Sequence, residues 1–324
     1  MKIDNRIITR LQPDFYNIIP SFSKEELEIR LNDYPFHLAT LLAVRNIRKV
    51  ISNDKCRKGL TEFLATDFDV QRGLLCEVLG SRGFSEKTMS AFRKVKREIF
   101  VNKHYRRYSY LETSIPFTRL SCLSNPSIIA IMIEKLQADK SNKILEIGIG
   151  SGYHACCIIE SLGGDCEFVG VEVNPEYFEF GQKTVREAGY SNIDLHFGSE
   201  YVLLEYYRGS FDRVYTASAF KDIPSHITNL MATEGYFQGT RPLTRDEFES
   251  EIPTVWLRQT YKSYEEYMSS DWYQRFACLA TYKKRGRDFK EIDVVYDVAF
   301  VPYRFLSDGD VYEENRSIIP EIEI

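Results

Sequence analysis

The chain of 324 residues lacks any apolar run long enough to span a membrane, and its N-terminus lacks the hydrophobic core of a signal peptide. We therefore expect a cytoplasmic protein without a membrane partner. Its seven cysteines, an odd number, show no metal-ligand spacing, and its five histidines are scattered, so we expect no metal site. The adjacent Cys156 and Cys157 fall on an expected helix, which suits buried thiols rather than disulfides.

The net charge of −5 hides an uneven distribution along the chain. Residues 1–110 carry 21 Lys/Arg and 13 Asp/Glu, a local charge of +8, and the remainder carries 21 and 34, a charge of −13. The positive part is densest at Arg93, Lys94, Lys96, Arg97, Lys103, Arg106 and Arg107. This segment is interpreted either as a solvated helix face or as a dock for an acidic polypeptide or nucleic acid.

The order of expected elements indicates the fold class. The N-terminal part reads as helical, with a capping box at 23–26, an amphipathic stretch at 37–51, a helix at 70–79 closed by Gly80, and a further helix at 85–100. Strands and helices then alternate at 143–148, 153–162, 167–172, 175–188, 193–197 and 211–218, with a helix near 224–232 and strands near 236–240 and 294–302. This alternation predicts a parallel sheet with helices on both faces.

We expect two parts in the chain. Residues 1–84 form a helical N-terminal extension, and residues 85–324 form a Rossmann-like domain. An insertion at about 244–292 is charged and aromatic, and we expect it to be helical around 264–273. With 44% hydrophobic residues, the composition is that of an ordinary globular protein.

A glycine-rich turn after an apolar strand carries the strongest functional signal. The strand at 143–147 runs into Gly148, Gly150 and Gly152, a helix follows, and Glu172 ends the next strand. Such a turn lets the backbone approach a ligand closely and directs helix N–H groups toward it. The carboxylate of Glu172 can accept hydrogen bonds from both hydroxyls of a ribose.

The residues in and before this turn indicate which kind of ligand it binds. It departs from the dinucleotide pattern G-x-G-x-x-G at the third position. The acidic residue Glu146, two positions before the first glycine, is typical of proteins that bind S-adenosylmethionine. That cofactor has no pyrophosphate, so the turn can hold its methionine moiety. The alternative is a tight turn in an ordinary α/β protein.

A second candidate site lies before the cofactor strand. Asn125 is a plausible N-cap and Pro126 fits the first turn of the helix that follows, which places Ser124 at a helix N-terminus. A hydroxyl there can hydrogen-bond a substrate carboxylate, although it can equally serve as a cap. Methyl transfer to a carboxylate needs no strong base, because the nucleophile is ionised near pH 7. This agrees with the absence of an obvious Ser-His-Asp or Cys-His arrangement, and His154 and His226 are interpreted as structural.

These residues resemble the protein-L-isoaspartate O-methyltransferase family. The family's "V-P/D-R-E-x-F-V", "A-Y-x-D" and "T-I-S-x-P" are matched by 95–101, 109–112 and 122–126, and "VLEIGTGSGYHAA" is matched by 144–155. The later landmarks "PFD", "IP", "GG" and "RFVP" are matched at 210–214, 223–224, 235 and 299–302. The resemblance covers about 85–242 and 294–303.

The resemblance implies a seven-stranded methyltransferase sheet with a reversed last strand and a carboxyl O-methyltransferase acting on isoaspartyl or aspartyl residues of a protein or peptide. It implies that Ser124 is the active-site serine, with Tyr110 and Leu123 beside the substrate. The expected cofactor residues are Glu146, Gly148, Gly150, Gly152, Tyr153, Glu172, Ser199 and Glu200.

Four departures from the family pattern stand out. Ser199 replaces the usual Asp, which puts the adenine contacts in doubt, and Cys122, Glu112 and Thr118 replace a Thr, an Asp and a Gly. Related enzymes methylate an aspartate of a ribosomally made peptide, and the ester then closes to a succinimide. Repair and tailoring both stay open on the sequence. So do two alternatives, a nucleic-acid methyltransferase that uses the basic segment and a binding protein without turnover.

Overall fold

The computed structural model describes most of the chain from residue 62 onwards. The described residues are 62–103, 105–111, 114–118, 121–219, 223–250, 262–269, 276–286, 288–299 and 301–302. The capping box expected at 23–26, the amphipathic stretch at 37–51 and Glu112 lie outside these ranges. Within them, no helix is both long and apolar enough to cross a membrane.

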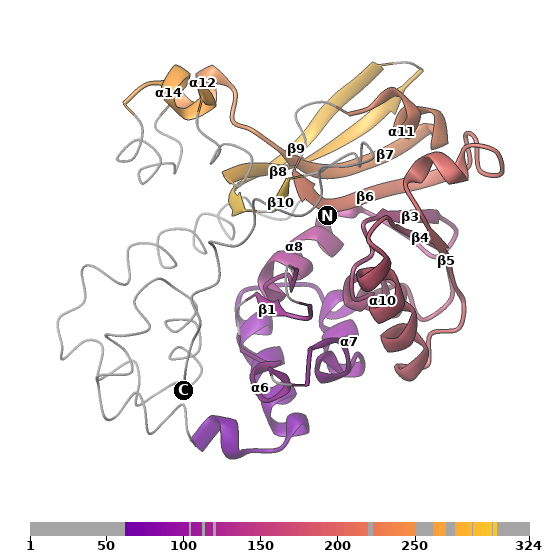
Figure 1. The fold of residues 1–324 in the computed structure, drawn as a ribbon. Coiled ribbons are helices and arrows are strands. Elements are labelled where there is room, and N and C mark those ends of the chain that lie inside the picture. The colour runs from indigo at the N-terminus through magenta and orange to yellow at the C-terminus, as the bar shows by residue number, and fades with distance from the viewer. Residues whose placement is uncertain are drawn as a thin grey trace.

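A single eight-stranded sheet forms the centre of the fold (Figure 1). Its parallel part consists of β3 (Lys143–Ile147), β4 (Glu167–Glu172), β5 (Ile193–Phe197), β6 (Phe211–Ala219) and β7 (Met231–Arg241). The strand order is β5-β4-β3-β6-β7-β8-β9, with β8 (Phe276–Arg285) and β9 (Asp288–Ala299) forming an antiparallel hairpin at one edge. The short β10 (Val301–Pro302) pairs in parallel with the end of β6.

Helices cover both faces of the sheet. The larger hydrophobic cluster contains α6 (Phe68–Ser81), α7 (Glu86–Lys94), α8 (Pro126–Leu136) and α9 (Tyr153–Ser161), and the first three gather on one side of the sheet (Figure 1). Residues of α10 (Pro175–Glu187) also pack in this cluster. A second cluster contains residues of η3 (Glu200–Leu203) and α11 (Ser225–Leu230). Along β3, Ile144 packs in the first cluster and Leu145 and Ile147 in the second, as alternation along a strand requires.

The expected strands and helices between 143 and 218 are confirmed within a residue or two, and so are the two proline-containing helix starts. Asn125 caps α8 by accepting a hydrogen bond from the Ser127 N–H at 2.8 Å, and Asn174 caps α10 in the same way. Each cap is followed by proline in the first turn. These local signals work because the cap side chain and the N–H group that donates to it lie two or three residues apart.

The helix expected at 85–100 ends early. Helix α7 stops at Lys94, Val95 is extended, and the chain re-forms as the short 3-10 helix η1 (Arg97–Phe100). With about 3.6 residues per turn, a continued helix would place Arg97 opposite the buried Val95. The break lets both residues face the core, where Arg97 is fully buried.

The segment 244–292 contains more than an insertion. Its helices are α12 (Arg245–Glu249) and α14 (Tyr264–Ser269), and the expected helix around 264–273 is therefore found in part. However, β8 and the first residues of β9 also lie in this segment and are part of the main sheet. The strand antiparallel to its neighbours on both sides is β8, so the expectation that the last strand is reversed is wrong. The alternation of strands and helices along the chain does not predict which strand runs antiparallel to the others, because this depends on how the strands pair in the sheet.

Helix α6 packs into the body of the domain. Leu75 and Leu79 are buried against the core, the ring of Phe68 lies 6.3 Å from that of Tyr110, and Arg82 hydrogen-bonds Ser127. The division at 84/85 stays a prediction, and this packing argues for a boundary nearer the N-terminus.

Candidate active site

The glycine-rich turn joins β3 to α9 through three residues with positive φ. Gly148, Gly150 and Gly152 have φ of 79°, 53° and 80°, which L side chains rarely adopt. A Cβ on Gly150 would lie 3.2 Å from the ring of Phe117, and one on Gly152 would lie 2.3 Å from a methyl of Val185. The turn therefore needs glycine both for its conformation and for its close packing.

Glu172 ends β4 beside this turn, and its side chain is almost fully buried. Oε1 accepts hydrogen bonds from the N–H groups of Val173 and Asn174, and Oε2 accepts one from Gly150, all at 3.0 Å. Burial raises the pKa of this carboxyl, and the three N–H groups oppose that rise. Because a carboxylate oxygen accepts about two hydrogen bonds, the remaining capacity lies on Oε2. A ribose hydroxyl can use that capacity, and a second would compete with Gly150.

Glu146 lies beneath the turn in a buried group with His154 and Tyr215. Burial raises the pKa of Glu146 well above its usual value and lowers the pKa of His154 to about 3. The His154 Nδ1 atom lies 3.9 Å from Glu146 Oε1, and its ring centroid lies 4.7 Å from that of Tyr215. Burial therefore favours the uncharged form of both groups, the carboxylic acid of Glu146 and the unprotonated imidazole of His154.

Ser124 occupies the short connection between β2 (Cys122–Leu123) and α8. Strand β2 pairs with β1 (Ile115–Pro116), and Asn125 caps the helix directly after the serine. Ser124 is half-buried. It is therefore held between a strand pair and a capped helix N-terminus, which favours an anion through the helix dipole.

A buried arginine links this connection to the cofactor turn. The guanidinium of Arg97 donates from Nη2 to the Ser124 carbonyl and from Nε to the Ser109 carbonyl, both at 2.8 Å. It also lies 4.8 Å from the ring centroid of Tyr153, the first residue of α9. One side chain thus contacts both the Ser124 connection and the helix that begins after the turn.

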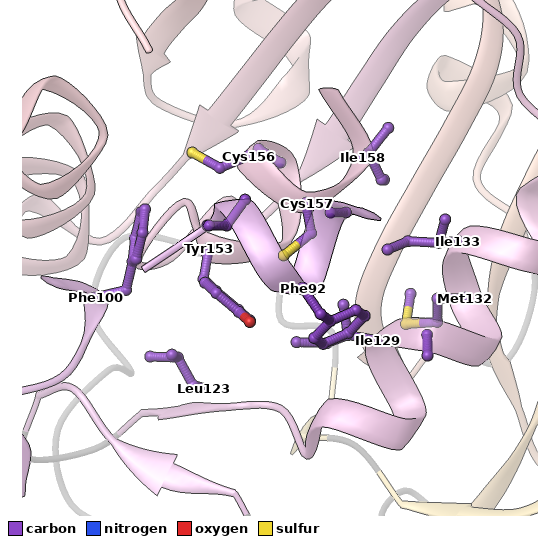
Figure 2. Packing of buried hydrophobic residues seen from close by; sticks show 14 of the residues in the cluster. Phe92, Phe100, Leu123, Ile129, Met132, Ile133, Tyr153, Cys156, Cys157 and Ile158 are labelled. Carbon is purple, nitrogen blue, oxygen red and sulfur yellow. The ribbon is translucent and has the colours of Figure 1, made fainter. Parts of the chain in front are cut away.

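Tyr110, Leu123 and Tyr153 are all buried. Figure 2 shows Tyr153 and Leu123 packed near Phe100 in the hydrophobic cluster. The Tyr110 hydroxyl donates to Glu98 and accepts from Arg72 at 3.3 Å, and burial raises its pKa. In the described structure these three side chains are therefore buried in the protein. Their direct contact with a ligand stays a prediction.

Ser199 and Glu200 come directly after β5. The N–H of Gly198 donates to the Glu172 carbonyl at 2.9 Å, so this loop lies next to Glu172. Ser199 is half-buried, whereas Glu200 is buried and pairs with His226, on which the ring of Tyr201 stacks with centroids 4.0 Å apart. Adenine binding by these two residues stays a prediction.

Two residues near the turn were not expected from the sequence. Phe117 covers Gly150 and packs on Tyr177 and Phe180, with centroids 5.6 and 5.3 Å away. Ser218, near the end of β6, has its Oγ 4.0 Å from where a Cβ on Gly148 would lie. Both residues are distant from the turn in the sequence. Only Ser218 could have been predicted to lie near the turn, because it stands near the carboxyl end of a parallel strand.

Comparison with known sequences identifies similar proteins. A family model described as protein-L-isoaspartate(D-aspartate) O-methyltransferase matches residues 71–237. The chain is 33% identical over 170 residues to protein-L-isoaspartate O-methyltransferase 1 of Archaeoglobus fulgidus, which covers 52% of this chain and 78% of that protein. It is 32% identical over 154 residues to the protein-L-isoaspartate O-methyltransferase of Methanococcus maripaludis, covering 47% and 72%.

Two solved structures share the fold. A protein-L-isoaspartate O-methyltransferase superposes with a TM-score of 0.56 at 21% identity, over 72% of this chain and 66% of that one. A putative one from Plasmodium falciparum, in complex with S-adenosyl-L-homocysteine, gives a TM-score of 0.52 at 15% identity, over 74% and 99%. At these identities the likeness shows the fold alone, and the predicted fold class is confirmed.

Proposed function

This chain belongs to the protein-L-isoaspartate O-methyltransferase family, and from that premise we propose that it methylates a carboxylate in a polypeptide. The target is the α-carboxylate of an isoaspartyl residue or the side-chain carboxylate of an aspartyl residue. The cofactor is S-adenosylmethionine. The observation that carries the proposal is the bridge made by Arg97. It holds the Ser124 connection against the first residue of the helix that begins after the glycine-rich turn.

The backbone of the turn and the carboxylate of Glu172 suit this cofactor. Three glycines leave the backbone open, and Glu172 keeps acceptor capacity on Oε2 for a ribose hydroxyl. When bound, the cofactor supplies a methyl group on a sulfonium, which an oxygen nucleophile can attack in line.

The substrate side needs positioning rather than activation. A carboxylate is already ionised near neutral pH, so no general base has to remove a proton. We assign Ser124 to donate its hydroxyl hydrogen bond to one carboxylate oxygen, which leaves the other oxygen aligned for transfer. The N-terminus of α8 favours the negative charge, and the surrounding apolar residues exclude water.

The methyl ester can react further within the substrate. The backbone nitrogen of the next residue can attack the ester carbonyl, release methanol and close a succinimide. Hydrolysis of that ring repairs an isoaspartyl residue, whereas its retention tailors a peptide. Residues 1–70 lie outside the matched family region, and this additional chain supports a dedicated polypeptide partner.

We also propose a reducing, cytoplasmic location. Among the described residues five cysteines are free, and all of these except Cys122 are buried: Cys76, Cys122, Cys156, Cys157 and Cys166. Unpaired thiols of this kind are usual where disulfides do not form.

Mass spectrometry with isotope-labelled cofactor tests the function. An isoaspartyl peptide and its normal aspartyl twin are each incubated with the full chain. We expect transfer of one labelled methyl group to at least one of them, followed by loss of methanol. Binding of cofactor without transfer to either peptide would support a non-catalytic protein, and transfer to RNA would support a nucleic-acid methyltransferase.

A further inference from the structure

The basic segment contains cations in different situations. Arg93 pairs with Glu86, Lys94 pairs with Glu160 at 2.9 Å, and Arg97 is buried, so these three do not form an open charged face. The remaining four are exposed, and no ion pair joins them to an acidic residue within the described part of the chain. We call them the basic rim: Lys96, Lys103, Arg106 and Arg107.

The basic rim is held next to the Ser124 connection. Arg106 and Arg107 lie in the 3-10 helix η2 (Arg106–Tyr108), and Ser109 comes directly after it. The Ser109 N–H and hydroxyl both donate to the Arg106 carbonyl, and the Ser109 carbonyl accepts from Arg97. Because the same guanidinium also binds the Ser124 carbonyl, η2 and the candidate substrate site are fixed to one buried group.

Within the described ranges, no acidic side chain forms an ion pair with the basic rim. Glu98 is the acidic residue within this stretch, and its carboxylate accepts a hydrogen bond from Tyr110. Arg107 stacks on the ring of Tyr108, with 4.8 Å between the guanidinium carbon and the ring centroid. Tyr105, 40% exposed, adds an aromatic surface among the cations. Four positive groups therefore stand beside the candidate site for a carboxylate, on a chain whose net charge is −5.

We propose that the basic rim binds acidic side chains that flank the methylated residue, so that the preferred substrate is an acidic stretch of polypeptide. This inference rests on the proposed function and names the substrate class for the same site. Exposed ion pairs are individually weak, but several acting together raise the local concentration of an acidic chain. The charge of −13 beyond residue 110 disfavours a nucleic acid, whose backbone needs an extended positive surface.

Peptides of equal length test the proposal on the full chain. Three carry the same isoaspartyl residue, flanked by Asp and Glu, by Ser and Gln, or by Lys. We expect the acidic peptide to have the highest kcat/KM, by about tenfold over the neutral one, mainly through a lower KM. Raising the salt concentration from about 0.05 M to 0.5 M should remove most of that advantage, because exposed charges are screened.

The variant Lys103→Ala/Arg106→Ala/Arg107→Ala should bring the acidic-to-neutral ratio of kcat/KM close to one. A matched control, Lys140→Ala/Arg285→Ala/Lys290→Ala, removes three exposed cations elsewhere and should leave the ratio unchanged. Equal use of the three peptides, or an equal fall in the ratio for both variants, would overturn the proposal.

Failure of the proposed function gives a different result. If none of the peptides is methylated, fluorescence anisotropy still measures binding of the labelled acidic and neutral peptides. Preferential binding of the acidic peptide that the rim variant loses would support the basic rim without the activity. Loss of RNA binding in that variant, with no peptide preference, would assign the surface to nucleic acid instead.

Discussion

Replacing Arg97 tests the link between the two halves of the site. Arg97→Met keeps an unbranched side chain in place of the aliphatic stem but removes the charge and both hydrogen bonds to the Ser109 and Ser124 carbonyls. Arg97→Lys keeps the charge without the planar fork that reaches two acceptors at once. The two variants therefore separate charge from geometry.

The expected loss of stability in Arg97→Met follows from the contacts that Arg97 makes. Leaving a buried carbonyl without a donor costs about 1–3 kcal/mol, which applies in full to Ser109 and in part to the half-buried Ser124. Removing a fully buried charge offsets part of this, because burial disfavours the charged form and lowers the pKa of Arg97. We expect a loss of about 2–3 kcal/mol for Arg97→Met, which lowers Tm by about 4–12 °C in a domain of this size.

Activity should fall more than stability alone explains. Misplacing the Ser124 connection by about 1 Å can reduce transfer by about 100-fold. We expect kcat to fall strongly in Arg97→Met well below its Tm, with cofactor affinity changed less and partial recovery in Arg97→Lys. Scanning fluorimetry, cofactor titration and steady-state kinetics measure the three quantities. A Met variant with wild-type kcat would refute the role of Arg97 in positioning Ser124.

Further predictions concern the site and the domain boundary. Glu172→Ala should weaken cofactor binding by about 10- to 100-fold in calorimetry, and unchanged affinity would remove Glu172 from the site. Ser124→Ala should fold and bind cofactor but transfer methyl slowly, so equal turnover would exclude the serine. His154, with its pKa lowered to about 3, makes the unfolded state bind more protons below about pH 6.5. The contribution of His154 to the unfolding free energy should therefore fall by about 1.4 kcal/mol per pH unit down toward pH 3, and His154→Leu should remove this contribution in urea titrations. Glu146 acts with the opposite sign, because the folded state holds its proton above about pH 4.5. Stability should decline as pH rises from there toward the raised pKa, and Glu146→Gln should abolish that decline. A chain beginning at residue 62 should stay soluble and methylate a short isoaspartyl peptide, whereas aggregation or loss of cofactor binding would place the preceding segment in the core.

The basic segment shows how a linear pattern misleads about charge. In the sequence, Arg97 is one of seven closely spaced cations, yet the structure buries it completely. The helix that would have kept it exposed ends at Lys94. Its acceptors at Ser109 and Ser124 lie 12 and 27 residues away, so no local spacing could reveal them.

The sequence by itself determined the glycine-rich turn, the capped starts of α8 and α10, and the acid at the end of β4. Each depends on residues a few positions apart, whose backbone conformations and hydrogen bonds are local. Only the tertiary structure decided that β8 is the reversed strand, that Glu200 pairs with His226, and that Tyr110 bonds Glu98. Burial, charge pairing and strand pairing depend on groups brought together from distant parts of the chain, and the sequence pattern carries little record of them.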